Sequence, residues 1–172
     1  SAYKTSGGLH GVGSSVVNAL SAYMDVKISR DGAVHHDRYE RGIPVVELED
    51  GLLPVIGKTK KTGTCVNFLP DPTIFEKTRF KEEEIKSRLH ETAYLNPELT
   101  IIFTDKRKTQ EERIEYHEPD GIIGFIKDLN SKKEVIHDPV YYKGEAEGIE
   151  VEVAFQYVNE FHENVLGFCN NI

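Results

Sequence analysis

The feature that most constrains the fold of this chain is a glycine-rich stretch that leads directly into an apolar helical segment. Glycines stand at positions 7, 8, 11 and 13, and residues 16–20 that follow are mostly apolar. Glycine brings no side chain to bury and loses the most conformational freedom on folding, so these glycines serve close approach of the backbone. Ser14 and Ser15 are predicted to cap the helix, whose N-terminus offers unpaired N–H groups and partial positive charge. The stretch predicts either a site for an anion, typically a nucleotide phosphate, or a merely flexible loop.

The spacing of the glycines excludes the two best-known phosphate loops. No lysine separates Gly13 from Ser14, as the G-x-x-x-x-G-K-[ST] loop would require. Leu9 and His10 separate Gly8 from Gly11, which breaks the G-x-G-x-x-G pattern of dinucleotide sites. The stretch must therefore be interpreted through its longer context.

Alternating and helical periodicities predict an α+β fold. Asp31-Gly32 predicts a tight hairpin turn, and Pro70 and Pro72 predict the end of a strand. Apolar residues at helical spacing predict one helix from residue 79 to residue 95 and another over residues 122–129. Strands are expected at residues 24–30, 33–39, 45–53, 63–69, 100–104, 111–117, 149–157 and 164–172. Antiparallel strands with segregated helices define the α+β class.

Composition and charge narrow the class of protein. The 172 residues, with 38% hydrophobic and 29% charged, suit one globular domain or slightly more, and no apolar run approaches a membrane span. A net charge of −8 disfavours a grip on DNA by this chain alone, because phosphate neutralisation dominates such binding. No secretory signal is visible, so we expect a cytoplasmic protein with no membrane contact. The chain starts without methionine on a ligand loop, and we expect it to be a piece of a longer protein.

Several titratable clusters are predicted to carry no chemistry. His35 and His36 are adjacent on a strand and point to opposite faces, so they are not expected to chelate a metal together. Glu82, Glu83 and Glu84 are expected on the solvated face of a helix, and Glu150 and Glu152 on a solvated strand face. Cys65 and Cys169 lie in apolar runs and are expected to be buried free thiols.

The glycine-rich stretch resembles, residue by residue, the ATP lid of the B subunits of bacterial type IIA topoisomerases, DNA gyrase and topoisomerase IV. The resemblance continues in the same order along the whole chain, at residues 61–64, 68–71, 88–96, 105–107, 151–157 and 170–172. It implies the C-terminal part of a Bergerat-type (GHKL) ATPase sandwich over residues 1–118. Residues 119–172, after the joint at Pro119-Asp120-Gly121, would begin a ribosomal-S5-like transducer domain.

The resemblance also implies roles for individual residues in binding ATP with Mg²⁺. The loop would wrap the triphosphate with its backbone N–H groups, with His10 beside the γ-phosphate. Tyr3 and Ser15 would lie at the adenine, Thr64 on the pocket floor, and Arg30 at the pocket mouth where inhibitors bind. The expected ATP-binding residues are Tyr3, Gly8, Leu9, His10, Gly11, Val12, Gly13, Ser14, Ser15 and Thr64.

No catalytic residue and no metal ligand is expected within the chain. In the resembled family the water-activating glutamate, the asparagine that holds Mg²⁺ and the adenine-reading aspartate all precede the lid. The lysine that contacts the γ-phosphate follows the residues that match 170–172. The chain by itself is therefore expected not to hydrolyse ATP, because loss of a general base costs on the order of 10²–10⁴ in rate.

The partners implied by the resemblance are DNA, the A-type subunit of gyrase and a second copy of the B-type chain, in a heterotetramer of two A and two B chains. Gyrase and topoisomerase IV are not separated, since Ser14 leans toward topoisomerase IV and residues 88–96 toward gyrase. A chaperone or kinase of the same superfamily fits residues 61–64 and 170–172 less well. A different class remains open, in which the chain is a non-catalytic structural or binding module.

Overall fold

The computed structural model describes residues 11–171, and its contacts divide the chain into two compact units. The N-terminal unit spans Gly8–Arg79 and the C-terminal unit spans Phe80–Ile172. Within residues 11–171 no helix is both long and apolar enough to cross a bilayer.

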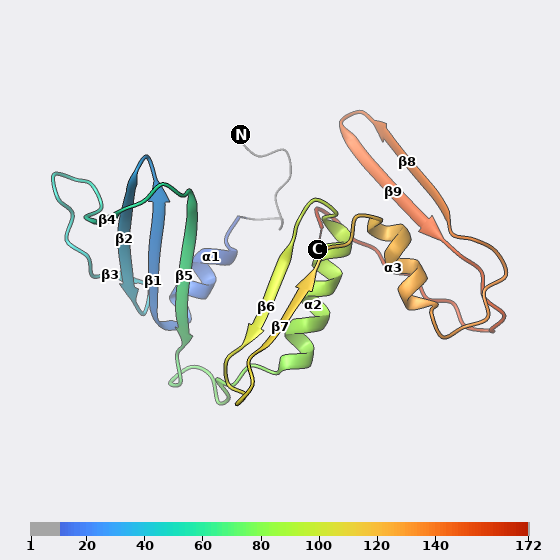
Figure 1. Ribbon diagram of the computed structural model, residues 1–172, viewed down its shortest axis with the longest axis horizontal. Coiled ribbons are helices and arrows are strands. Elements are labelled where there is room, and N and C mark those ends of the chain that lie inside the picture. The colour runs from blue at the N-terminus through green and yellow to red at the C-terminus, as the bar shows by residue number, and fades with distance from the viewer. Residues whose placement is uncertain (1–10, 172) are drawn as a thin grey trace. The chain divides into compact units, whose positions relative to one another are not determined.

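The N-terminal unit is an antiparallel sheet with one short helix (Figure 1). Its strands lie in the order β3-β2-β1-β5, and β4 pairs with the same edge of β2 as β3 but nearer its start. The elements are α1 (Gly13–Ala19), β1 (Ser21–Arg30), β2 (Ala33–Glu40), β3 (Ile43–Pro44), β4 (Val55–Lys58) and β5 (Gly63–Pro70). The predicted Asp31-Gly32 hairpin is confirmed, with φ values of 52° and 82° that match a type I′ turn.

The register gives this sheet one apolar and one polar face. Residues directly opposite across strands share a face, and alternate residues along a strand change face. Val26 pairs with Val66 and Ile28 with Thr64, so these side chains share the apolar face. The polar face carries Asp25, Lys27 and Ser29 of β1 with their cross-strand partners His36, Arg38, Cys65 and Asn67.

The strand predicted over residues 45–53 is wrong. This stretch forms a loop, and Glu49 and Leu52 exchange backbone hydrogen bonds around a turn at Asp50 and Gly51, both with positive φ. The outer edge of β2 is shared between β3 and β4, and from this stretch Val45 at its start donates to the Arg38 carbonyl of β2. An alternating pattern cannot by itself supply a neighbouring strand.

The C-terminal unit contains two hairpins and two helices (Figure 1). Hairpin β6–β7 and hairpin β8–β9 are separate two-stranded antiparallel sheets. The elements are α2 (Glu82–Leu95), β6 (Ile101–Asp105), β7 (Glu112–Tyr116), α3 (Gly121–Leu129), β8 (Val140–Ala146) and β9 (Ile149–Phe155). Helices and antiparallel sheets in both units confirm the predicted α+β class.

A ladder of aromatic rings joins α2, β7 and α3. His90 stacks on Tyr116 at 4.9 Å and on Tyr94 at 4.6 Å, and Tyr94 stacks on Phe125 at 5.0 Å between ring centroids. Phe168 extends the ladder to Phe125 at 6.2 Å. Burial, with the charges of nearby carboxylates, raises the pKa of Tyr94 to about 12. This ladder is the packing centre of the unit.

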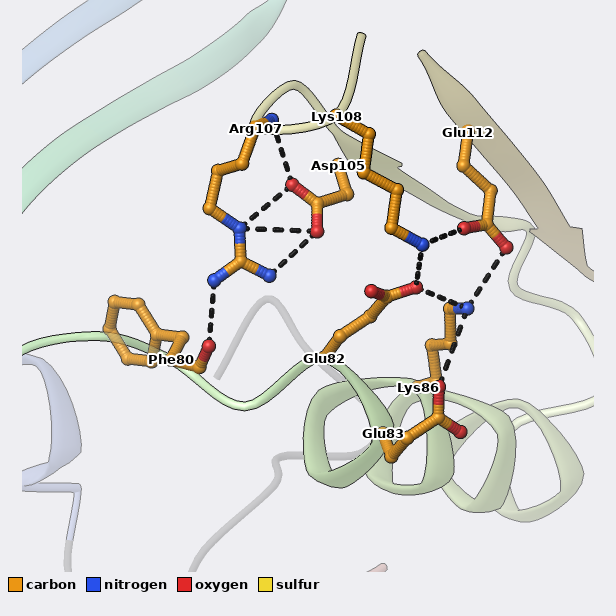
Figure 2. A network of polar contacts seen from close by, with 8 residues as sticks. All are labelled: Phe80, Glu82, Glu83, Lys86, Asp105, Arg107, Lys108 and Glu112. Carbon is orange, nitrogen blue, oxygen red and sulfur yellow. Dashed lines mark hydrogen bonds and ion pairs between the residues drawn. The ribbon is translucent and has the colours of Figure 1, made fainter. Parts of the chain in front are cut away.

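A network of ion pairs fixes the first turn of α2 to the β6–β7 hairpin (Figure 2). Lys86 Nζ lies 2.5 Å from Glu82 Oε1 and 2.9 Å from Glu112 Oε1, and Lys108 Nζ lies 2.8 Å and 2.6 Å from carboxylate oxygens of the same two residues. The hydrogen bonds from both lysines hold the pKa of Glu112 down at about 2. Glu82, at 17% side-chain exposure, was wrongly predicted to be solvated, whereas Glu83 is solvated as expected.

A neighbouring clamp closes the β6–β7 turn itself (Figure 2). The guanidinium of Arg107 donates to both carboxylate oxygens of Asp105 and to the backbone carbonyl of Phe80. Asp105 is buried, and the hydrogen bonds from Arg107 keep its pKa well below its usual range. The turn is therefore fixed to the first residue of the unit.

The strand predicted over residues 164–172 is also wrong for its described part. Residues 164–169 form no strand, and Asn170 and Asn171 adopt positive φ values of 51° and 63°. Instead Asn171 donates a side-chain hydrogen bond of 2.9 Å to Asn96 beyond the end of α2. Residues 164–171 therefore contact the helices of the unit, through the ring of Phe168 against Phe125 and the amide of Asn171 with Asn96.

The predictions for the remaining carboxylates and thiols had mixed outcomes. Glu150 and Glu152 are exposed as predicted, although Lys143 and Tyr141 reach them across the hairpin. Cys65 and Cys169 are free thiols, but both are exposed rather than buried. The two-unit division falls between residues 79 and 80, while the domain boundary predicted at residues 118 and 119 stays a prediction.

Candidate functional site

The part of the glycine-rich loop that the structure describes begins at Gly11. Gly11 has φ of 65°, and no atom of residues 11–171 lies within 4 Å of the position where a Cβ would be. A side chain is disfavoured there by backbone strain, so glycine favours the turn into α1. The predicted binding residues Tyr3, Gly8, Leu9 and His10 lie outside the described residues.

The start of α1 differs from the prediction. Val12 is the N-cap, and none of the side chains in residues 11–171 caps the helix. Ser14 and Ser15 are already helical residues, so the prediction that they cap α1 is wrong. The first N–H groups of any α-helix have no partner within it, and here no side-chain oxygen at the cap position accepts from them. They remain suited to an external acceptor.

The other end of α1 is anchored firmly to the sheet. Buried Ser21 donates from Oγ to the Val17 carbonyl at 2.6 Å, and the Asp71 N–H donates to the Leu20 carbonyl at 3.0 Å. Gly42 meets α1 closely, because a Cβ on it would lie 3.4 Å from Ala19 Cα. These contacts fix where α1 ends and therefore the line along which its N-terminus lies.

Asp71 is a structural residue whose role the sequence did not reveal. Its fully buried carboxylate accepts from Arg41 Nε at 2.7 Å and from the Thr73 hydroxyl and N–H at 2.7 and 2.8 Å. The hydrogen bonds from Thr73, followed by that from Arg41, lower the pKa of Asp71 to about 2. The nearest sequence signal was the Asp-x-Thr spacing after β5, typical of a side chain that bonds the backbone two residues on.

Thr64 and Arg30 share the apolar face of the sheet. Thr64 on β5 pairs with Ile28 on β1, and Arg30 lies two residues further along β1. This diagonal arrangement places the two residues on one face at a typical separation of roughly 7–8 Å. The Arg30 side chain is 75% exposed and its one ion pair among the described residues is with the adjacent Asp31 at 3.3 Å. Its guanidinium is therefore largely free for a ligand.

An open hollow of about 330 Å³ lies at the end of the sheet near β5. Most of the strand residues that line it belong to the polar face, opposite the face of Ile28 and Arg30. The lining residues are Lys27, Ser29, Val34, Lys61, Thr62, Gly63, Thr64 and Cys65. Among the predicted binding residues in the described part of the chain, Thr64 alone lines this hollow. The hollow thus does not coincide with the loop at Gly11.

The histidines of β2 hold no metal cluster. Within residues 11–171 no group of three or more His, Cys, Asp or Glu side chains is placed to hold a metal ion. His36 instead contacts Asp25 at 2.7 Å, and this hydrogen bond is the main cause that lowers the pKa of Asp25. The tract at residues 35–37 is structural.

Comparison with known proteins gives a consistent family. The family model described as DNA gyrase B matches residues 121–172. The chain is 49% identical, over 99% of its length, to the B subunit of DNA gyrase from Streptococcus pneumoniae and equally to the B subunit of DNA topoisomerase 4 from that species. It is 48% identical to the B subunit of DNA topoisomerase 4 from Staphylococcus aureus. The chain spans only about a quarter of these relatives, 26% for the two from Streptococcus.

Solved structures give the same result. The 43K ATPase domain of Thermus thermophilus gyrase B, crystallised with an aminocoumarin, matches with TM-score 0.73 and 36% identity over 87% of this chain and 40% of that one. The gyrase B structure of Myxococcus xanthus matches with TM-score 0.76 and 27% identity over 89% of this chain and 44% of that one.

Proposed function

Because the chain belongs, as a segment, to the family of B subunits of DNA gyrase and topoisomerase IV, we propose that it carries the ATP lid and part of the nucleotide pocket of such a protein. The observation that supports this most directly is Gly11. Gly11 has a positive φ, and no atom of residues 11–171 lies near its Cβ position. Two residues later α1 begins, and none of the described side chains caps its first N–H groups. Such amides are a preorganised site for phosphate.

In this proposal the backbone does most of the binding. Gly8, Leu9, His10, Gly11, Val12 and Gly13 offer N–H groups to the triphosphate, and Ser14 and Ser15 continue that surface into α1. Tyr3 and Thr64 face the adenine, and Arg30, free of any long-range ion pair in the described residues, lies at the mouth of the pocket. Neutral amides and one guanidinium suit a bound polyanion because they offer donors and positive charge, although the guanidinium of Arg30 also pairs with the exposed carboxylate of Asp31.

The chain's own residues fit ATP better than they fit its metal. The Mg²⁺ that accompanies ATP would neutralise phosphate charge, but none of the residues proposed here is a ligand for it. We assign that ligand, the water-activating glutamate and the adenine-reading aspartate to neighbouring parts of a longer protein. The segment alone therefore binds nucleotide weakly at most and does not turn it over.

We infer the wider role from the family. The intact protein would use ATP to close a dimer of B-type chains on DNA and to drive strand passage with its A-type partner in the cytoplasm. Residues 1–118 would belong to the ATPase domain and residues 119–172 to the transducer that follows it. Gyrase and topoisomerase IV remain equal alternatives, since both relatives from Streptococcus pneumoniae are 49% identical to this chain.

A second candidate is a non-catalytic structural segment, and one observation favours it. Val66 and Phe68 on β5 are 51% and 39% exposed on the apolar sheet face. Val151 and Tyr142 on the second hairpin are 48% and 65% exposed. Faces of this kind are covered in stable domains, so the segment would depend on neighbouring chain for much of its stability.

The two candidates are separated by calorimetric titration with a non-hydrolysable ATP analogue and Mg²⁺. The chain is compared with a version extended upstream to the length of its relatives. Binding only by the longer version assigns the lid a role that needs the upstream residues, and binding by both makes the lid amides and Thr64 sufficient. Absence of binding heat with both versions would refute the proposal that the chain carries a nucleotide site.

The lid itself is tested by Gly11→Ala in the extended protein. Affinity for the analogue is expected to fall about tenfold, since an alanine at positive φ costs roughly 1–2 kcal/mol and obstructs the amides. Gly51→Ala is the matched control, because Gly51 also has positive φ and open surroundings but lies in the 45–53 loop. Equal affinities of both variants and the parent would refute the role of Gly11.

A further inference from the structure

The hollow beside β5 has the chemistry of an anion site. Two lysines, Lys27 and Lys61, line it, and none of its described lining residues is acidic. Neither lysine takes part in any ion pair recorded among residues 11–171. Both side chains belong to exposed residues, so their ammonium groups are available to a ligand.

The acidic residue on the same face is already occupied. Asp25, two positions from Lys27 on β1, contacts His36 at 2.7 Å and Arg38 at 3.6 Å. Its charge is therefore shared with two partners on β2. Lys27 is left with a long-range attraction to that carboxylate rather than a direct pair.

The surrounding charge supports the same conclusion. Between residues 8 and 79 basic and acidic side chains are equal in number, so the acidic excess of the chain lies outside the N-terminal unit. Lys58 and Lys60 stand beside Lys61 at the end of β4 and in the following loop. The positive potential at this end of the sheet is thus not cancelled by the net charge of −8.

Neutral donors and open space complete the site. Ser29 and Thr62 add hydroxyl groups to the lining, and nothing lies within 4 Å of the Cβ position of Gly63. A volume of about 330 Å³ corresponds to roughly ten water molecules at about 30 Å³ each. This is room for one or two phosphate groups and too open to enclose a nucleoside.

We propose that the hollow lined by Lys27, Lys61, Ser29 and Thr62 binds a phosphate group, at a place separate from the ATP lid. The phosphate comes either from a small free anion such as pyrophosphate or from a nucleic-acid backbone. Of the residues assigned to the ATP pocket in the described part of the chain, Thr64 also lines the hollow, whereas Gly11 to Ser15 and Arg30 do not. The phosphate proposal rests on Lys27, Lys61, Ser29 and Thr62, so it does not require the ATP proposal. Binding would be weak and strongly salt-dependent, since the site is exposed.

The test is a titration of the isotope-labelled chain with pyrophosphate at low salt, followed by amide NMR. Shifts are expected at Lys27, Ser29 and residues 61–65. Lys27→Gln and Lys61→Gln should each raise the dissociation constant about fivefold, the effect of losing one charge at contact distance in water. Lys77→Gln, which removes an exposed lysine of the same unit outside the hollow, should leave it unchanged.

Two further experiments identify the source of the phosphate and test whether the anion binds at the ATP lid instead of the hollow. Gly11→Ala should not alter pyrophosphate binding, and an effect there equal to that of Lys27→Gln would place the anion at the lid and refute the proposal. If a short DNA duplex displaces pyrophosphate from the same amides, the ligand of the hollow is a nucleic-acid backbone. If the duplex does not displace it, the ligand is a small free anion. Absence of shifts at the hollow, or equal loss in Lys77→Gln, overturns the proposal.

Discussion

Replacement of Gly121 by alanine should destabilise the C-terminal unit by about 2–3 kcal/mol. Gly121 is buried at the start of α3 with φ of 56°, and an alanine in that conformation costs roughly 1–2 kcal/mol. Its Cβ would also lie 3.1 Å from Pro97 Cγ and 3.6 Å from the Tyr94 carbonyl. Those neighbours belong to the packed end of α2, so the added contact costs on the order of a further 1 kcal/mol.

The contribution of the contact can be separated from that of the backbone. Gly148→Ala is the matched control, because Gly148 has φ of 77° but nothing within 4 Å of its Cβ position. It should cost only the conformational part, roughly 1–2 kcal/mol. The double variant Gly121→Ala with Pro97→Ala should recover part of the loss, as expected for residues in contact.

The assay is urea unfolding followed by far-ultraviolet circular dichroism, since the chain contains no tryptophan. Native-state hydrogen exchange at α2 and α3 then locates the loss within the C-terminal unit. Equal destabilisation by Gly121→Ala and Gly148→Ala would refute the claim that Pro97 limits the space. A neutral Gly121→Ala would refute the assigned backbone conformation as well.

Three further outcomes are expected. The pKa of Asp71 is about 2 in the folded chain and about 3.9 in the unfolded chain, so the stability that Asp71 contributes is present above pH ~4 and is lost as the pH falls toward ~2. Asp71→Asn should therefore flatten that part of a curve of stability against pH. An unchanged curve would contradict the role of Asp71 as a buried anchor. Lys86→Met should lower the thermal midpoint more than Lys81→Met, because Lys86 joins Glu82 to Glu112 whereas Lys81 makes one exposed pair; equal midpoints would show that the network adds nothing. The chain should self-associate at high concentration in sedimentation runs, and Tyr142→Lys on the exposed apolar face of the β8–β9 hairpin should reduce this, whereas a monomeric parent would contradict it.

The elements that the sequence predicted correctly are those whose cause is local. The Asp31-Gly32 turn follows from the φ values that these two residues tolerate, and α2 follows from apolar spacing before Asn96-Pro97. The glycine at position 11 was likewise expected in a loop before a helix. In each case the residues that decide the conformation are neighbours in the chain.

The predictions that failed needed a partner from elsewhere in the chain. Residues 45–53 and 164–171 have strand-like patterns, but within the described residues neither stretch forms a strand of any sheet. Glu82 was expected in solvent because, besides Lys86 one turn along α2, it pairs with Lys108, which lies 26 residues away. Cys65 is exposed because β5 is an edge strand with little covering either face of the sheet in the described residues.

The sequence by itself determined the family resemblance, the α+β class and the hairpin turn, because these depend on residue identity and spacing along the chain, and it predicted the lid, which stays a prediction. Tertiary structure alone decided that Asp71 anchors the end of α1, that an aromatic ladder joins α2 to α3, and that Lys27 and Lys61 meet in one hollow. Each of these rests on contacts between residues distant in sequence, and such contacts are set by strand register and packing. Local pattern carries no information about register until the neighbouring strand is known.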